Sequence, residues 1–269
     1  MSFKLDDIVI DRIVMATAEK TDGTLLYTLT QLSEATIEVT AEAKEARDAR
    51  GSLIKKFYQG KSGTLTATNA MINLNMLAAA SGNEKQIAGA GASMIQMPRI
   101  LVVKQGTASV SLVNANTNET LVAGSVRVYE LGNNGALGKA YTLGTETATS
   151  STFIISGTTL TLPTDTTADK FVIKYEKKSE NAVKITNSST KFPDTVKLTL
   201  KVLAIDPCEP DTLREAYIII PSFQVSPEVS ITINTEGTLD YTGDLQVAYC
   251  SGDQELYTIV MCGDDEEED

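Results

Sequence analysis

The chain has 269 residues, of which 42% are apolar, and it carries a net charge of −12. This size and composition support a folded core, while the absence of a long uncharged apolar run excludes a membrane-spanning helix. The acidic balance argues against tight binding to nucleic acid phosphate. Asp6, Asp7 and Asp11 stand where a secretory signal needs basic and then apolar residues, so we expect no export signal.

Histidine is absent from the sequence. Its absence removes the usual general base of Ser-His and Cys-His catalysis and the commonest ligand of catalytic zinc. The cysteines, Cys208, Cys250 and Cys262, lack the short spacing of metal sites, and no glycine-rich segment has the pattern of a phosphate-binding loop. We therefore expect no enzymatic activity, no catalytic residue, no metal and no cofactor.

The N-terminal residues predict antiparallel strands. Residues 7–15 and 24–32 are rich in apolar residues and flank Asp22-Gly23, a strong hairpin signal. Residues 36–41 alternate apolar and polar side chains, as a half-buried strand does. From 42 to 50 the charges alternate in sign, which predicts a soluble, charged loop able to meet an oppositely charged partner.

Beyond this loop we expect a hairpin and then a helix. Residues 53–58 and 64–68 read as strands joined by 59–63, whose two glycines suit a tight turn. Thr68 or Asn69 is the expected cap of a helix that ends at Gly82. The helix is apolar on more than one side, so a sheet covers one side and another subunit is a candidate cover for the other.

The rest of the chain reads as short strands with turn signals at roughly ten-residue spacing, the pattern of a sandwich or barrel. Residues 105–190 are either an elaboration of the same sheet or an inserted immunoglobulin-like module. The clearest strand is 196–202, whose even residues are apolar and face the core. A closing meander then uses the ranges 216–220, 229–233, 245–249 and 256–261. The six acidic residues of 264–269 predict a disordered tail.

The predicted fold is therefore mainly β. It is an antiparallel β-sandwich or barrel over residues 1–263, with one flanking α-helix and a long charged hairpin loop.

Two segments resemble the tail tube proteins of tailed bacteriophages. The first, within 36–82, contains GSLIKKFYQ, GKSGTLTAT and NAMINLNMLAAASG; the second, within 215–261, contains AYIIIPSFQVSPEVSITINTEGTLDYTG. The resemblance implies a virion structural protein that forms hexameric rings, stacked into a tail tube that conducts DNA at ejection without binding it specifically. It further implies synthesis in the host cytoplasm, contacts with other copies and other tail proteins, and no membrane association.

The charged segment and the helix supply the candidate contacts between subunits. An edge strand completed by a neighbour gives a continuous sheet around a ring, and a mixed-charge loop fixes register by sign pairing. The candidate residues are Lys44, Glu45, Arg47, Asp48, Arg50, Lys55, Lys56, Leu74 and Leu77. The alternatives are that 42–62 is only a mobile surface hairpin, and that the protein is a head decoration protein, a baseplate protein or a cell-surface adhesin.

Overall fold

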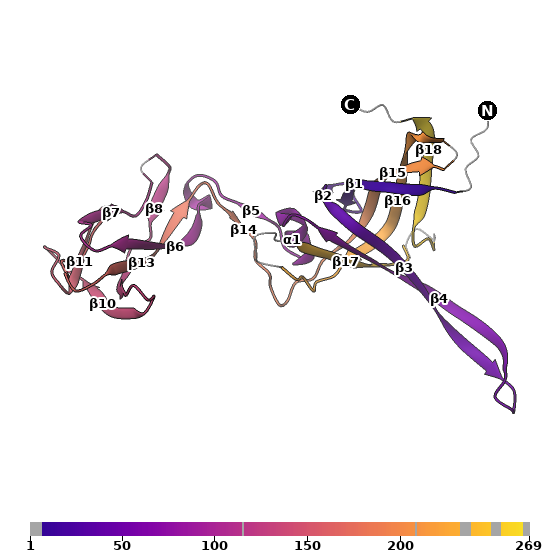
Figure 1. The fold of residues 1–269 in the computed structure, drawn as a ribbon, viewed down its shortest axis with the longest axis horizontal. Coiled ribbons are helices and arrows are strands. Elements are labelled where there is room, and N and C mark those ends of the chain that lie inside the picture. Colours follow the sequence, from indigo (N-terminus) through magenta and orange to yellow (C-terminus); the bar gives the residue numbers. More distant parts are fainter. Residues whose placement is uncertain (1–6, 115, 208, 232–237, 249–253, 266–269) are drawn as a thin grey trace. The chain divides into compact units, whose positions relative to one another are not determined.

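A computed structural model describes residues 7–265 apart from 115, 208, 232–237 and 249–253; the side chains of 209–211 and 262–265 are also left out. The described chain is mainly β, as predicted. It divides into two compact units (Figure 1). We call Met1–Lys85 with Ile185–Asp269 the terminal unit, because both chain ends belong to it, and Gln86–Lys184 the inserted unit.

The terminal unit is built on one antiparallel sheet. Its described strands follow the order β2-β1-β15-β16-β17-β4-β3, and β18 pairs with β16 beyond the part covered by β17. Their bounds are β1 Val9–Glu19, β2 Leu25–Leu29, β3 Leu32–Arg47, β4 Leu53–Asn69, β15 Thr195–Asp206, β16 Glu209–Val225, β17 Leu239–Leu245 and β18 Thr258–Asp265. The predicted hairpin at Asp22-Gly23 joins β1 to β2, with Gly23 at a φ of 85°.

One face of this sheet forms the core. The alternation predicted for 196–202 is confirmed, because Val196, Leu198, Leu200 and Val202 are all buried whereas Lys197 is exposed. A fully buried leucine contributes about 2 kcal/mol relative to an exposed one. Tyr27 of β2 and Tyr241 of β17 share a hydrogen bond of 3.0 Å, although these strands are not neighbours in the sheet. The sheet therefore curls, so that β2 and β17 face each other across the core.

The hairpin predicted over 53–68 is wrong, because β4 runs through it as one strand. Ala41 pairs with Lys61 and Ala43 with Tyr58, so β4 carries an extra residue opposite Glu42. Gln59 and Gly60 thus form a β-bulge, whereas Lys61, Ser62 and Gly63 pair with β3 in regular register and the chain does not reverse. The reversal lies at 48–52 instead, and the predicted charged loop is mostly part of β3.

Helix α1 covers Leu74–Ala80 and is shorter than predicted. The expected cap at Thr68 or Asn69 is wrong, since both residues belong to β4. Asn73 caps the helix, and its side-chain Oδ1 accepts hydrogen bonds of 3.0 Å from the backbone N–H groups of Asn75 and Met76. Asn73 also donates to the carbonyl oxygen of Thr28, which fixes the helix to β2.

Gly82 ends α1, as predicted. Its φ is 63°, its N–H donates to the carbonyl of Ala79, and the next N–H donates to that of Ala78. This double closure is the Schellman motif. A Cβ added at Gly82 would lie 2.3 Å from the carbonyl oxygen of Phe192, so glycine is required for its small size as well as for its backbone angle.

The inserted unit has its own sheet and core. Its described strands follow the order β6-β13-β9-β10-β11-β12-β7, with β8 on β13, while β5 and β14 form a two-stranded sheet. All pairs are antiparallel except β10 with β11. The bounds are β5 Gln86–Ile87, β6 Ile95–Lys104, β7 Ser109–Ser111, β8 Glu119–Leu121, β9 Arg127–Leu131, β10 Leu137–Leu143, β11 Thr152–Ser156, β12 Thr159–Thr161, β13 Lys170–Ser179 and β14 Val183–Lys184, with a 3-10 turn at Gly91–Ser93.

The core of the inserted unit is separate from that of the terminal unit. Phe171, Ile173 and Tyr175 of β13 are buried in it beside residues of β9, β10 and β12. The unit begins at Gln86 and ends at Lys184, whereas the sequence prediction placed the elaboration or module at 105–190.

The end of the chain differs from the predicted meander. The strand expected at 245–249 lies earlier in the chain, because β17 covers Leu239–Leu245, where it pairs with both β4 and β16. Within the expected strand 229–233, Ile231 makes only an isolated bridge, and Ile233 lies outside the described residues. β18 extends through Asp265, two residues into the acidic run, and residues 266–269 lie outside the described chain.

Candidate assembly surface

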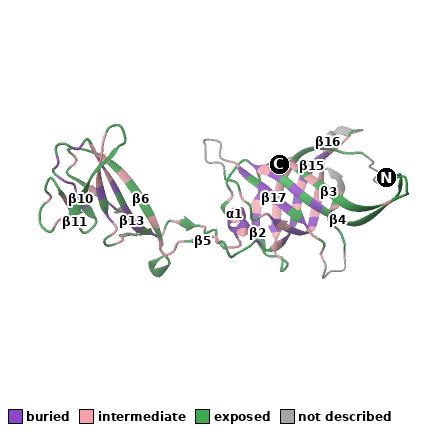
Figure 2. Ribbon diagram, turned by 90° about the horizontal axis from the view of Figure 1, so that it is seen from below, coloured by how far each residue is buried: buried purple, intermediate pink, exposed green. Residues whose placement is uncertain are grey.

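The β3–β4 hairpin projects from the terminal unit. β17 covers β4 only from Gly63 onward, so β3 and β4 pair with each other alone from the Thr40–Ser62 pair to the turn. We call residues 40–62 the arm. In Figure 2 the arm is almost entirely exposed, and nearly all of its side chains are classed as exposed. The arm therefore contributes little to the core of its own unit.

The turn at the tip of the arm is organised by Asp48. Its Oδ1 accepts hydrogen bonds from the backbone N–H groups of Arg50, at 2.9 Å, and Ser52, at 2.8 Å. Gly51 has a φ of 85° and donates its N–H to the carbonyl of Asp48. The carboxylate of Asp48 is thus engaged in making the turn.

A second acidic residue of the arm, Glu45, is engaged by neighbouring cations. Arg47 donates to Glu45 at 2.5 Å and Lys56 lies 3.2 Å from it, directly across the strand pair. The hydrogen bond from Arg47, followed by that from Lys56, lowers the pKa of the Glu45 carboxyl below its ordinary value. These exposed pairs add little to stability, but they engage Glu45 within the arm itself.

The arm carries a positive balance on an acidic protein. Its six basic and three acidic residues give it a net charge of +3, against −12 for the whole chain. Lys44, Arg50, Lys55 and Lys61 make no ion pair with any described residue. The charges that alternate in the sequence are therefore not balanced on the folded arm. Glu45 and Asp48 are engaged in contacts within the arm, and four cations have no ion-pair partner among the described residues.

Large apolar side chains are also exposed on the arm, which the sequence prediction missed. Tyr58 is 69% and Ile54 68% exposed, and Leu53 and Phe57 are exposed as well. Lys55 lies 5.2 Å from the centre of the Phe57 ring, a cation–π distance. The sequence does contain a signal for this exposure. Leu53-Ile54 and Phe57-Tyr58 are consecutive apolar residues, and successive side chains of a strand point to opposite faces. A two-stranded ribbon with solvent on both faces therefore leaves some of them exposed.

The candidate residues fall into two groups. Lys44, Glu45, Arg47, Asp48, Arg50, Lys55 and Lys56 all lie together on the outer half of the arm. The structure places Leu74 and Leu77 apart from them, on α1. Leu74 is 44% exposed and Leu77 is half-buried, whereas Met76, Ala78 and Ala80 form the buried side of the helix.

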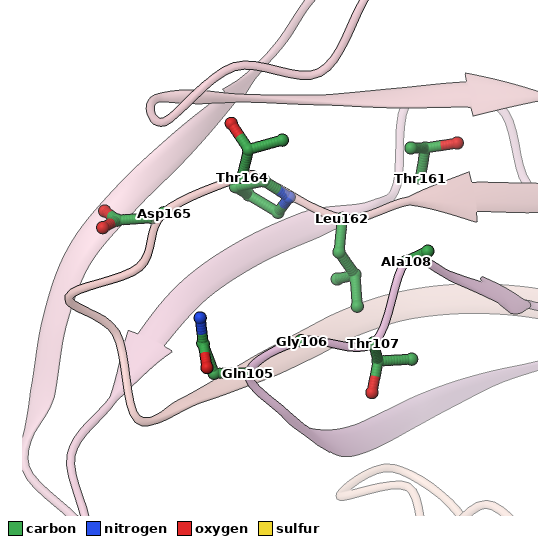
Figure 3. Close-up of a pocket in the computed structure, with 9 residues that line it drawn as sticks. Gln105, Gly106, Thr107, Ala108, Thr161, Leu162, Thr164 and Asp165 are labelled. Carbon is green, nitrogen blue, oxygen red and sulfur yellow. The ribbon is translucent and has the colours of Figure 1, made fainter.

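The inserted unit contains a small pocket, shown in Figure 3. The pocket has a volume of about 230 Å³ and is lined by residues 105–108 and 161–165. Asp165, at its edge, accepts hydrogen bonds from Tyr141 at 3.1 Å and from the Thr167 hydroxyl at 2.7 Å. Hydrogen bonds from Thr167 lower the pKa of Asp165 to about 2. The carboxylate is therefore committed to contacts inside the unit.

The described part of the chain contains neither a metal-binding cluster nor a membrane-spanning helix. Among those residues, no group of three or more Cys, Asp or Glu side chains is arranged to hold a metal ion. Cys208, Cys250 and the side chain of Cys262 lie outside that part. None of the described helices has the length and apolar character needed to cross a membrane.

Comparison with known proteins places the chain in a family. The model of the YomU/Tube protein family matches residues 8–254, which include the inserted unit, the arm and most of the terminal unit. No protein with a curated function matches the chain. Because the family match covers nearly the whole sequence, this chain belongs to the YomU/Tube protein family of phage tail tube proteins and is a component of the virion tail.

Proposed function

We propose that copies of this protein assemble into hexameric rings, and that the rings stack into the tube through which DNA leaves the capsid. The arm is the observation that carries the proposal. It is a long two-stranded ribbon that leaves its sheet, contributes little to its own core and exposes both cations and aromatic rings. Exposing these apolar side chains to water is unfavourable, and covering the arm with another copy would bury them.

The edges of the terminal sheet support side-by-side assembly. β2 and β3 are the two ends of its main strand order, so each has one edge without a partner among the described strands. Exposed edges favour pairing with further strands, and repeating that pairing around an axis closes a ring without leaving free edges. The proposal gives the protein a structural role and no enzymatic one.

The charge of the chain suits a conduit. Outside the arm the residues carry a net charge of −15, which follows from −12 for the chain and +3 for the arm. A wall of this sign repels phosphate and lets DNA slide without specific binding. We place synthesis and assembly in the host cytoplasm, with other tail proteins as further partners.

Shortening the arm tests this function. The variant replaces residues 41–61 with Asn-Gly, which makes a two-residue turn between Thr40 and Ser62. We expect this variant to keep the circular dichroism spectrum and unfolding transition of the terminal unit, because the removed residues lie outside the core. We expect sedimentation to show monomers or single rings at concentrations where the wild-type protein forms long polymers.

A substitution at another exposed turn of the same unit is the control. Replacing Asp22 with Asn in the Asp22-Gly23 turn leaves the arm intact and should leave polymerisation unchanged. Long polymers of the arm-shortened variant, indistinguishable from those of the wild type, would contradict the proposal.

A further inference from the structure

The sheet of the inserted unit has a second face, opposite its core. β6, β13 and β9 are neighbours in this sheet, and Phe171, Ile173 and Tyr175 of β13 belong to the core. Because successive side chains of a strand point to opposite sides, the even-numbered residues of β13 lie on the other face. The register places the even-numbered residues of β6 and the odd-numbered residues of β9 beside them. We call these positions of the three strands the outer face.

The outer face is basic. Its cations make no ion pair with any described residue. They are Lys104, Arg127, Lys170, Lys174 and Lys178. By contrast, the buried Lys177, on the core side of β13, is paired with Glu119. The single acidic residue at the outer-face positions is Glu176, which accepts a hydrogen bond from Gln96, so the outer face has a net charge of +4.

Two pairs of cations stand directly opposite each other on neighbouring strands. Lys104 of β6 is opposite Lys170 of β13, and Lys174 of β13 is opposite Arg127 of β9. Like charges in this position destabilise a sheet. The arrangement does not favour folding, and it becomes favourable when negative charge lies across the strands.

This positive charge is local. The inserted unit has nine basic and seven acidic residues, a net charge of +2, which leaves −14 for the terminal unit because the whole chain has −12. A negatively charged ligand is therefore repelled by most of the chain and attracted to the outer face.

An apolar row lies between the two pairs of cations. Val102 of β6 is opposite Val172, which is opposite Tyr129 of β9. Val102 is 58% exposed, and its neighbour along the same face, Ile100, is 65% exposed. β6 is at one end of the strand order and none of its residues is classed as buried (Figure 2). Rows two residues apart in a strand are about 7 Å apart, so charged and apolar rows alternate at that spacing.

We propose that the outer face binds a linear, negatively charged polysaccharide. The cations pair with its charged groups, and the C–H groups of its sugar rings cover the apolar row. Lys170 and Lys178 are eight residues apart, about 27 Å along the strand, which suits a chain better than a small anion.

The same face is less suited to nucleic acid. Proteins that bind single strands stack the bases on exposed aromatic rings. Tyr129 is the one aromatic residue at the outer-face positions, and it is half-buried. The proposal concerns the inserted unit and does not depend on the proposed assembly of the terminal unit.

Binding of the full chain to fluorescein-labelled polygalacturonate, measured by fluorescence anisotropy, tests the proposal. We expect binding that weakens as the salt concentration rises. Lys104→Glu with Lys174→Glu should raise the Kd at least about tenfold, because the charged groups of the ligand then meet like charges. Lys104→Arg with Lys174→Arg keeps the charge and should stay within about threefold of the wild type. Both positions are exposed, so these variants should keep the wild-type unfolding transition.

Lys191→Glu with Lys197→Glu is the matched control. These two exposed lysines belong to the terminal unit, so the control should bind polygalacturonate as the wild type does. If the variant at Lys104 and Lys174 also binds as the wild type does, or if the control loses binding equally, the outer face is not the site.

Further probes identify the class of ligand. Ile100→Ser with Val102→Ser should raise the Kd for polygalacturonate about threefold, because less apolar surface remains to meet the sugar rings. Neutral dextran should not bind, and a single-stranded oligothymidylate and poly-glutamate should bind more weakly than polygalacturonate. Equal binding of dextran, tighter binding of either other polyanion, or no binding of polygalacturonate would overturn the proposal.

Discussion

At the level of single residues, position 82 requires glycine for two reasons, its backbone angle and its small size. Its backbone has a φ of 63°, and the space for a side chain is taken by the backbone of Phe192. Gly82→Ala should lower the free energy of unfolding by about 2 kcal/mol or more, because it adds a steric clash to the backbone strain. Urea denaturation of the full chain measures the loss.

Gly23→Ala separates the two causes. Gly23 has a similar positive φ of 85°, but an added Cβ there meets no atom within 4 Å. Its loss should be about 1 kcal/mol, the cost of the left-handed backbone alone. Equal losses for the two variants would show that the contact with Phe192 is unimportant.

The buried tyrosine pair makes the terminal unit sensitive to alkali. Burial raises the pKa of Tyr27 to about 12, and burial also raises the pKa of Tyr241 well above 10.0. The folded state holds these protons more tightly than the unfolded chain, so the stabilisation is complete below pH 10 and is lost as the pH rises toward 12. Thermal unfolding measured from pH 9 to pH 12 should show this decline.

Tyr27→Phe is the companion variant. It removes one titrating group and leaves the Tyr241 hydroxyl buried without its partner, which costs about 1–3 kcal/mol at neutral pH. Its alkaline decline should be shallower than that of the wild type. A decline of the same steepness would contradict the assignment to this pair.

Asp165 makes the inserted unit sensitive to acid. Hydrogen bonds from Thr167 lower its pKa from 3.8 to about 2, so its contribution to stability is present above pH 4 and is lost as the pH falls toward 2. Hydrogen exchange in β10 and β13 should accelerate over that interval in the wild type. In Asp165→Asn the acceleration should be reduced, whereas Glu146→Gln, at an exposed carboxylate, should behave as the wild type.

At the level of elements, the sequence predicts types of structure better than partners. The alternation in 196–202 specified a strand and its buried face, because side-chain direction in a strand has a period of two residues. The bulge opposite Glu42 was not predictable in this way. Gly60 and Gly63 fit a turn or a bulge equally well, and the choice depends on the partner strand β3.

The candidate surface was predicted in part for the same reason. Its charged residues are visible in the sequence, but the use of Asp48 in the turn and of Glu45 in local ion pairs depends on the hairpin register. β17 was missed because Asp240, Gly243 and Asp244 are poor strand formers, and its pairing with β4 and β16 overrides that preference.

Helix α1 supports a prediction that separates folding from assembly. Leu74 is 44% exposed and Met76 only 1%. Leu74→Asp should change the free energy of unfolding by less than about 1 kcal/mol and should weaken polymerisation if this side of α1 contacts another copy. Met76→Asp should prevent folding, because it buries an unpaired carboxylate. Sedimentation beside denaturant unfolding reports both effects; a folded Leu74→Asp protein that polymerises normally would remove α1 from the interface.

At the level of the whole molecule, the two units have separate cores and are joined where β5 and β14 pair. Gln86 lies opposite Lys184 in that pair, so the chain leaves the terminal unit and returns to it at adjacent points. Replacing 86–184 with a short Gly-Ser linker should give a protein that folds and still polymerises, because the arm belongs to the terminal unit. Loss of folding in this variant would show that the terminal unit depends on the inserted one.

If copies of this protein build a hollow, ring-stacked tube, that tube is visible in negative-stain electron microscopy of the purified wild-type protein. We expect tubes of uniform width whose side views show regular ring spacing and whose end-on views show a central channel with sixfold symmetry. Monomers at all concentrations, or filaments that lack a channel, would contradict the proposed assembly.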